Sequence, residues 1–196
     1  MRLPLRPLAP YTLLRAAVEN ASLALWLVAP SERETRLLRV LRLAIADVRD
    51  SGPVHEIAGN TIDPVAVRVA KIVSAGKRAG LTDAQLKQRD SWTEIVTAAD
   101  RVIHRRGDRA VEFSWRAGSG IMHARDWARM AVLERGDVID DGGETLTMSV
   151  TTSFTAVLYS VMATERIILE VTRLSNASRR AGMGLQDTAS VNPESG

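Results

Sequence analysis

The stretch between Glu112 and Met130 holds an arginine and a histidine whose spacing could support chemistry. Arg116 and His123 are seven positions apart, close to two helical turns, so both side chains would emerge on one face, about 10 Å apart along the axis. An arginine can hold a phosphodiester oxygen, while an imidazole titrating near neutrality moves a proton to or from a ribose hydroxyl or a leaving oxygen. The pair therefore predicts phosphoryl chemistry that needs neither a metal nor a cofactor.

The helical period extends this pair into a polar stripe on one continuous helix. At 100° per residue, the members of the stripe fall within about 60° of one another. They are Glu112, Arg116, Ser119, His123, Trp127 and Met130. Ser119 is a weaker catalytic candidate, because a serine nucleophile usually follows a buried strand and none is expected here. Gly118 and Gly120 each cost a helix about 1 kcal/mol relative to alanine, which predicts a kink, a break or a close backbone approach.

Charged side chains on the first expected helix, over residues 11–28, could support the site. This segment is otherwise almost entirely apolar, so Arg15 and Glu19 should be at least half buried and need partners. They could pair with each other, or Arg15 could reach Glu112. The candidate supporting shell consists of Arg15, Glu19, Glu112 and Trp127. The alternative is a buried network of purely structural role, formed by Arg15, Glu19, Glu112, Arg116 and His123.

The remaining periodicity predicts an all-α fold, with about six or seven helices in a single domain over residues 1–180. A second helix is expected at 32–50, where Ser51, Gly52 and Pro53 close it. Leu146, Met148 and Val150 alternate with threonine and serine after a turn, so a small β-hairpin is expected near 136–151.

A long last helix is expected from about Thr152 to Arg179, within the core. Its apolar positions are Phe154, Val157, Leu158, Val161, Ile168, Val171 and Leu174. Glycine, serine, asparagine and proline dominate the segment 181–196, which is expected to be a disordered tail.

The composition narrows the class of protein. A chain of 196 residues with 45% hydrophobic and 25% charged residues fits one globular domain. Its net charge of +3 permits an anionic partner such as RNA without requiring one. The absence of cysteine fits a cytoplasmic protein. Because Arg15 and Glu19 interrupt the only long apolar segment, neither a signal peptide nor a membrane span is expected. The three histidines lack metal-ligand spacing.

The Arg-x6-His pattern in an all-helical domain resembles the signature of the HEPN superfamily. That resemblance implies a metal-independent endoribonuclease that works as a dimer, with Arg116 and His123 at the interface. Active members usually carry a polar residue directly after the arginine, where this chain has Ala117. The string WRAGSGIMHARDW also resembles helical proteins of high-GC actinobacteria in which a Trp-Arg-x-x-Ser-Gly-x-x-His pattern recurs.

Three functions from different classes follow. The first is an RNA-cleaving enzyme with His123 as general acid or base and Arg116 on the phosphate. The second is a non-catalytic helical interaction or regulatory protein. The third is a protein that binds a small ligand in a pocket with Trp26, Trp115 or Trp127 at its base. Small residues beside the polar stripe, together with the apolar first helix, also predict self-association through helices.

Overall fold

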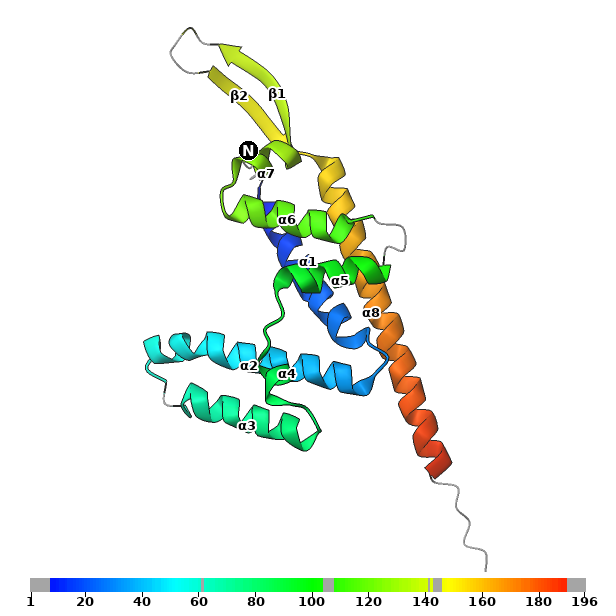
Figure 1. Ribbon diagram of the computed structural model, residues 1–196. Helices are drawn as coiled ribbons and strands as arrows, with labels where there is room; N and C mark the ends of the chain where they lie inside the picture. The colour runs from blue at the N-terminus through cyan, green and yellow to red at the C-terminus, as the bar shows by residue number, and fades with distance from the viewer. Residues whose placement is uncertain (1–7, 61, 104–107, 141, 143–145, 190–196) are drawn as a thin grey trace, which may run out of the picture. The chain divides into compact units, whose positions relative to one another are not determined.

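Helices dominate the computed structural model, which describes residues 8–60, 62–103, 108–140, 142 and 146–189 (Figure 1). The described residues form eight helices and one two-stranded antiparallel hairpin, so the predicted all-α class with a small hairpin is confirmed. The elements are α1 (Ala9–Val28), α2 (Arg33–Ile57), α3 (Val65–Arg78), α4 (Asp83–Lys87), α5 (Trp92–Ile103), α6 (Ala110–Met122), α7 (Asp126–Val132), β1 (Leu133–Asp140), β2 (Leu146–Thr152) and α8 (Phe154–Ala189). Among the described residues, every helix is too short or too polar to cross a bilayer.

The chain divides into two compact units, which the sequence analysis did not anticipate. One unit combines Met1–Trp26 with Ile95–Gly196, and the other is Leu27–Glu94. In the second unit, Ile45, Leu81 and Leu86 form a core between α2, α3 and α4. The expected end of α2 at residue 50 is wrong, because the helix continues to Ile57 with Pro53 inside it. A proline removes only one amide from the helical ladder, so it does not have to end the helix.

Tyr11 anchors the core of the first unit. Its side chain lies with Ala117, Ile121, Ala128 and Val132 in one buried cluster. The Tyr11 hydroxyl donates a hydrogen bond of 2.8 Å to the carbonyl oxygen of Val132. Burial and the nearby negative charge of Glu134 raise the pKa of this phenol. The cluster joins α1, α6 and α7, which are the elements that position the candidate site.

The glycines of α6 mark close approaches between helices. A Cβ on Gly118 would lie 2.6 Å from the Cβ of Arg15 and 2.9 Å from the carbonyl oxygen of Tyr11, both on α1. A Cβ on Gly120 would lie 2.5 Å from the Cβ of Ala128 on α7. Of the three outcomes that the glycines predicted, close backbone approach is therefore the one that occurs at both positions.

The expectation of one continuous helix over residues 112–130 is wrong. α6 ends at Met122 and α7 begins at Asp126. Between them Ala124 adopts a left-handed conformation with φ 52°, and the amide of Arg125 donates to the carbonyl oxygen of Gly120 at 2.8 Å. This is the hydrogen bond of a Schellman turn, which ends a helix and reverses the chain. The reversal lets Ala128 pack back on Gly120.

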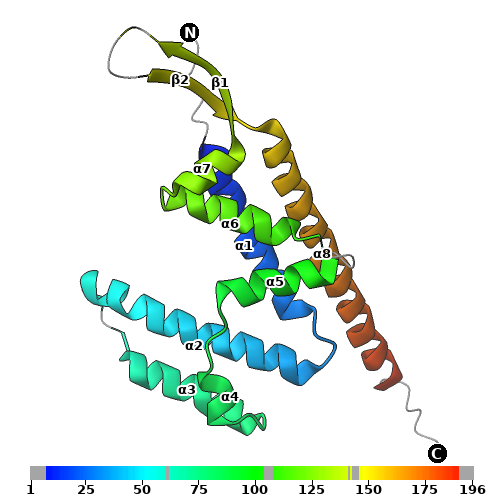
Figure 2. The same cartoon turned by 45° about the horizontal axis from the view of Figure 1, so that its top comes forward.

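The hairpin and the last helix both run farther than expected. β1 pairs with β2 from Leu133↔Thr152 to Asp140↔Leu146, and Figures 1 and 2 show the hairpin extending beyond α7. α8 continues to Ala189, although we expected a disordered tail from residue 181. Proline is absent from the sequence between 181 and 189, so nothing there removes a helical hydrogen bond. Residues 190–196 lie outside the described part of the chain.

Candidate functional site

The end of α6, the turn after it and the start of α7 form a cavity of about 200 Å³. Its lining contains four members of the predicted polar stripe: Arg116, Ser119, His123 and Trp127. The other lining residues are Trp115, Gly120 and Arg125. The cavity therefore combines two arginines, one histidine and two tryptophans.

Arg116 lines the cavity, and the Nε of its guanidinium is hydrogen-bonded to Glu112. Its Nε donates a hydrogen bond of 2.7 Å to a carboxylate oxygen of Glu112, and its Cζ lies 5.9 Å from the centroid of the Trp115 ring. The side chain is nevertheless 53% exposed. Within the described residues, the two terminal nitrogens of the Arg116 guanidinium make no hydrogen bond, so they can donate to a bound anion.

His123 is the C-cap of α6, where its amide donates to the carbonyl oxygen of Ser119 at 3.0 Å. The residue is exposed. In the part of the chain that the structure describes, its imidazole has no hydrogen-bond partner. Both ring nitrogens are therefore available to exchange a proton with a molecule in the cavity.

Glu112 is the buried acidic group behind the cavity, with 3% of its surface exposed. It accepts hydrogen bonds from Arg109 Nε at 2.8 Å and from Arg116 Nε at 2.7 Å. Burial by itself would raise the pKa of Glu112, but the hydrogen bonds and positive charges of the two arginines outweigh it and lower the pKa. Glu112 is thus a carboxylate at neutral pH, and it offsets part of the positive charge at the site.

Arg15 and Glu19 form a separate group on α1. Arg15 pairs with Glu19 at 2.7 Å, and the same carboxylate accepts a hydrogen bond of 2.8 Å from the indole Nε1 of Trp115. Arg15 also reaches the sulfur of Met122 at 3.2 Å. The pairing of Arg15 with Glu19, rather than with Glu112, splits the expected single network into two groups, and His123 belongs to neither.

Two residues that shape the site could not be identified from the sequence: Arg125 lines the cavity, and Asp100 holds the start of α6. On an unbroken helix Arg125 would lie outside the polar stripe, on the side that faces solvent. The turn at Ala124 brings it into the lining of the cavity instead. Asp100 of α5 is buried and accepts hydrogen bonds from the amides of Val111 and Glu112. Capping residues are recognised in a sequence when they directly precede their helix, and Asp100 does not.

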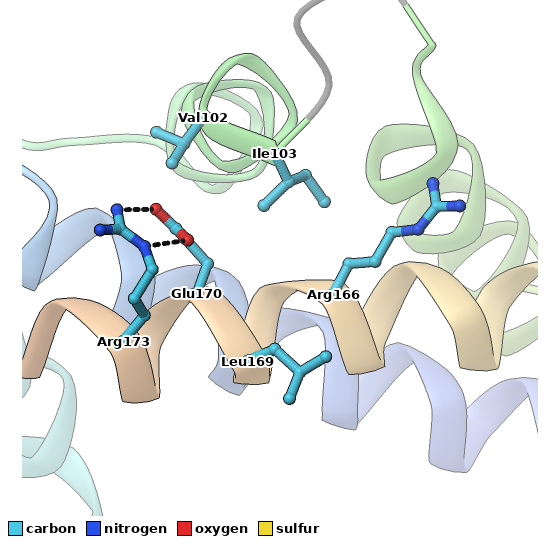
Figure 3. Close-up of a pocket in the computed structure, with 6 residues that line it drawn as sticks. All are labelled: Val102, Ile103, Arg166, Leu169, Glu170 and Arg173. Carbon is cyan, nitrogen blue, oxygen red and sulfur yellow. Dashed lines mark hydrogen bonds and ion pairs between the residues drawn. The ribbon is translucent and has the colours of Figure 1, made fainter. Parts of the chain in front are cut away.

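Two larger hollows lie elsewhere in this unit. One of about 500 Å³ lies between α5 and α8, where Figure 3 shows Arg173 making two hydrogen bonds, of 2.8 and 2.6 Å, to Glu170. The other, of about 570 Å³, is lined by Phe113 and Tyr159. The Tyr159 hydroxyl donates to Asp108 at 2.6 Å, and this bond, with burial, raises the pKa of Tyr159 to about 12. Among the described cavities, only the one at α6 and α7 contains a histidine.

Trp26, considered as the floor of a ligand pocket, is buried and lines none of the three cavities. The chain matches no family model, and comparison with curated proteins and with solved structures finds no similar protein.

Proposed function

We propose that the cavity between α6 and α7 binds an RNA phosphodiester and cleaves it without a metal ion. The observation that supports this proposal is the shared lining: Arg116, His123 and Arg125 face one open cavity together with Trp115 and Trp127. Terminal guanidinium nitrogens provide donors for phosphate oxygens, and the imidazole of His123 provides a group that can exchange a proton with the substrate.

In the proposed reaction, the ribose 2′-hydroxyl attacks the adjacent phosphorus. His123 takes the hydroxyl proton as the O2′–P bond forms, and the P–O5′ bond breaks as water protonates the leaving oxygen. Arg116 and Arg125 stabilise the charge that develops on the non-bridging oxygens. The products are a 2′,3′-cyclic phosphate and a 5′-hydroxyl end. RNA as the substrate would place the protein in the cytoplasm, with which the absence of cysteine is compatible.

Trp127 favours an unpaired strand as substrate. Its side chain is 54% exposed beside the two arginines. An exposed aromatic ring offers a stacking surface to any base that is not paired, and such stacking contributes about 1–3 kcal/mol per base in proteins that bind single strands. A base within a duplex is already stacked and cannot use this surface.

The ion pair of Arg116 with Glu112 supports the alternative, a non-catalytic helical interaction or regulatory protein. A buried glutamate needs a positive partner, because an unpaired carboxylate would be strongly destabilising there. Arg109 and Arg116 meet that need together. In this alternative Arg116 stabilises the fold, and His123 has no role in catalysis.

The two functions are separated by incubating unstructured RNA with the protein in EDTA between about pH 6 and pH 8, where histidine titrates. Under the catalytic proposal the wild type cleaves RNA and leaves an all-deoxy strand intact. His123→Ala abolishes cleavage with an almost unchanged midpoint of thermal unfolding, because the replaced side chain is exposed. His55→Ala, in α2, is the matched control and retains cleavage. Intact RNA with the wild-type protein would overturn the proposal.

A further inference from the structure

Apart from Ile167, α8 buries small and polar side chains and leaves most of its large apolar side chains exposed. The buried residues of this helix are Ser160, Ala163, Thr164 and Ile167. The exposed large side chains range from 40% for Tyr159 to 74% for Phe154, and include Leu158, Val161, Met162, Ile168 and Leu169. The expectation that α8 lies in the core with Phe154, Leu158, Val161 and Ile168 among its apolar positions is wrong for these four residues, which are exposed. At 100° per residue the centres of the two sets lie about 150° apart around the helix.

The exposed set has the spacing of a helix-pairing seam. Phe154, Leu158, Val161, Glu165, Ile168 and Thr172 follow one another at intervals of four, three, four, three and four residues. We call these six residues the α8 seam. Such alternation is the pattern by which one helix packs along another. Thr172 does not disturb it, because its hydroxyl is satisfied by the carbonyl oxygen of Ile168 at 2.9 Å.

Most of the small-residue surface that first suggested self-association is used inside the protein. Ala117, Gly120 and Ala128 are buried, and Ala124 and Ala131 are the exposed members of that row. Pairing between copies therefore needs another surface, and the α8 seam is the longest row of exposed large apolar side chains on any described helix.

We propose that the α8 seam binds the α8 seam of a second copy of this chain, in antiparallel orientation. The size of the surface fits this occupant. The four apolar members of the seam, together with the adjacent exposed Met162 and Leu169, offer on the order of 500 Å². A stable dimer buries roughly 800 Å² on each copy, of which somewhat more than half is apolar. A seam of this pattern is also complementary to itself, as a two-fold interface requires.

Glu165 decides the orientation. It is exposed and, among the described residues, has no ion-pair partner. A parallel pairing in register would place the two copies of Glu165 opposite each other, and like charges in one layer are repulsive. An antiparallel pairing centred on Val161 places the two carboxylates about 12 Å apart along the axis, beyond the screening length of about 8 Å at physiological salt. It also sets Phe154 of one copy against Ile168 of the other.

Sedimentation velocity at micromolar concentration is the first test. We expect a dimer for the wild type. Val161→Glu places a charge at the centre of the seam and raises the Kd of the dimer at least about 30-fold. Leu13→Glu is the matched control, since Leu13 is 73% exposed on α1 and this variant remains dimeric. A monomeric wild type, or a dimer that Leu13→Glu disrupts as much as Val161→Glu, would overturn the proposal.

Cysteine cross-linking tests the orientation and does not depend on the glutamate variant folding. The chain has no native cysteine, so each introduced thiol is unique. Val161→Cys forms a disulfide-linked dimer under mild oxidation, because the two thiols meet at the axis. Phe154→Cys alone does not, because its copies are about 21 Å apart along the axis, but a mixture of Phe154→Cys and Ile168→Cys does. Cross-linking of Phe154→Cys with itself would overturn the antiparallel arrangement.

The α8 proposal stands independently of ribonuclease activity, since it involves none of the residues that line the α6–α7 cavity.

Discussion

The carboxylate of Asp100, in α5, accepts a hydrogen bond of 2.8 Å from the backbone amide of Glu112, at the start of α6. Its other oxygen accepts from the amide of Val111 at 3.0 Å, and both bonds are buried. The first amides of a helix have no partner within the helix. They are usually capped by the residue just before it, whereas here the cap comes from another helix. Asp100 thereby fixes the end of α6 that carries Glu112 and, four residues on, Arg116.

Asp100→Ala removes the cap and leaves two buried amides without acceptors. We expect the free energy of unfolding to fall by about 2–4 kcal/mol, measured by urea denaturation at neutral pH. Asp100→Asn should lose less, because its amide oxygen can still accept one of the bonds. Asp47→Ala, an exposed position on α2, is the control and should change stability by less than about 0.5 kcal/mol. Equal losses at Asp100 and Asp47 would contradict the capping role.

Gly118→Ala tests the contact between α1 and α6. In an isolated helix this change would stabilise by about 1 kcal/mol. Here the new methyl group would lie 2.9 Å from the carbonyl oxygen of Tyr11, which is backbone and cannot rotate away. We expect the contact to prevail and the protein to lose about 1–3 kcal/mol in urea unfolding. Ser119→Ala, the adjacent and partly exposed position, provides the comparison. A stabilised Gly118→Ala variant would mean that the helices are not in this contact.

Ala124→Gly should raise the stability of the protein, whereas Gly118→Ala should lower it. Ala124 holds φ 52° at the Schellman turn, a conformation that costs a residue with a Cβ roughly 1 kcal/mol relative to glycine. We therefore expect the midpoint of thermal unfolding to rise, by an amount equivalent to about 0.5–1 kcal/mol. Ala117→Gly, inside α6, should lower the midpoint of thermal unfolding. A lower midpoint for Ala124→Gly would indicate that the turn is absent in solution.

The site could be predicted from the sequence only where its geometry is local. Arg116, Ser119 and His123 belong to one helix and its cap, so the helical period was sufficient to place them on a common face. Arg125 depends on a turn, and the turn depends on Ala128 packing against Gly120. Neither periodicity nor residue type at position 124 reveals that packing, since alanine is a strong helix former. The same limit applies to Asp100, whose partners lie on another helix.

The fold was predictable to a similar extent. Apolar periodicity located α2 and the hairpin, because each has one polar and one apolar side, and an almost entirely apolar segment located α1. For α8 the same pattern identified a helix but assigned the wrong face to the core. Ser160 and Thr164 are buried there, with their hydroxyls donating to the carbonyl oxygens of Ala156 and Ser160. A hydroxyl that is satisfied within its own helix costs little to bury, so hydrophobicity alone could not identify the inner face.

Both tyrosines of the chain should ionise above the usual pKa near 10. The carboxylate of Asp108 raises the pKa of Tyr159 to about 12, and burial raises that of Tyr11. Because the folded-state values lie above those of the unfolded chain, this contribution to stability is present below about pH 10 and is lost as the pH rises through the folded values. The ultraviolet absorbance of phenolate, followed as the pH is raised, measures the pKa values of both tyrosines. Asp108→Asn should bring one of the two transitions back toward pH 10, and Tyr159→Phe should remove that transition. An unchanged titration in Asp108→Asn would disprove the bond.

Glu112 should make the protein sensitive to acid. Arg109 and Arg116 lower its pKa below the ordinary value of 4.5 despite burial. For a carboxyl with a lowered folded-state pKa, the contribution to stability is present above about pH 4.5 and disappears as the pH falls through the folded value. Glu112→Gln should therefore be less stable than the wild type at about pH 7, by on the order of 1.5–3 kcal/mol for the lost charge-assisted bonds. The difference should shrink toward about pH 3, where both residues are neutral. Glu165→Gln, which removes an exposed carboxylate, should run parallel to the wild type across that range when measured below the concentration at which the chain pairs. A Glu112→Gln deficit that persists unchanged at acidic pH would show that the carboxylate is not held ionised by the two arginines.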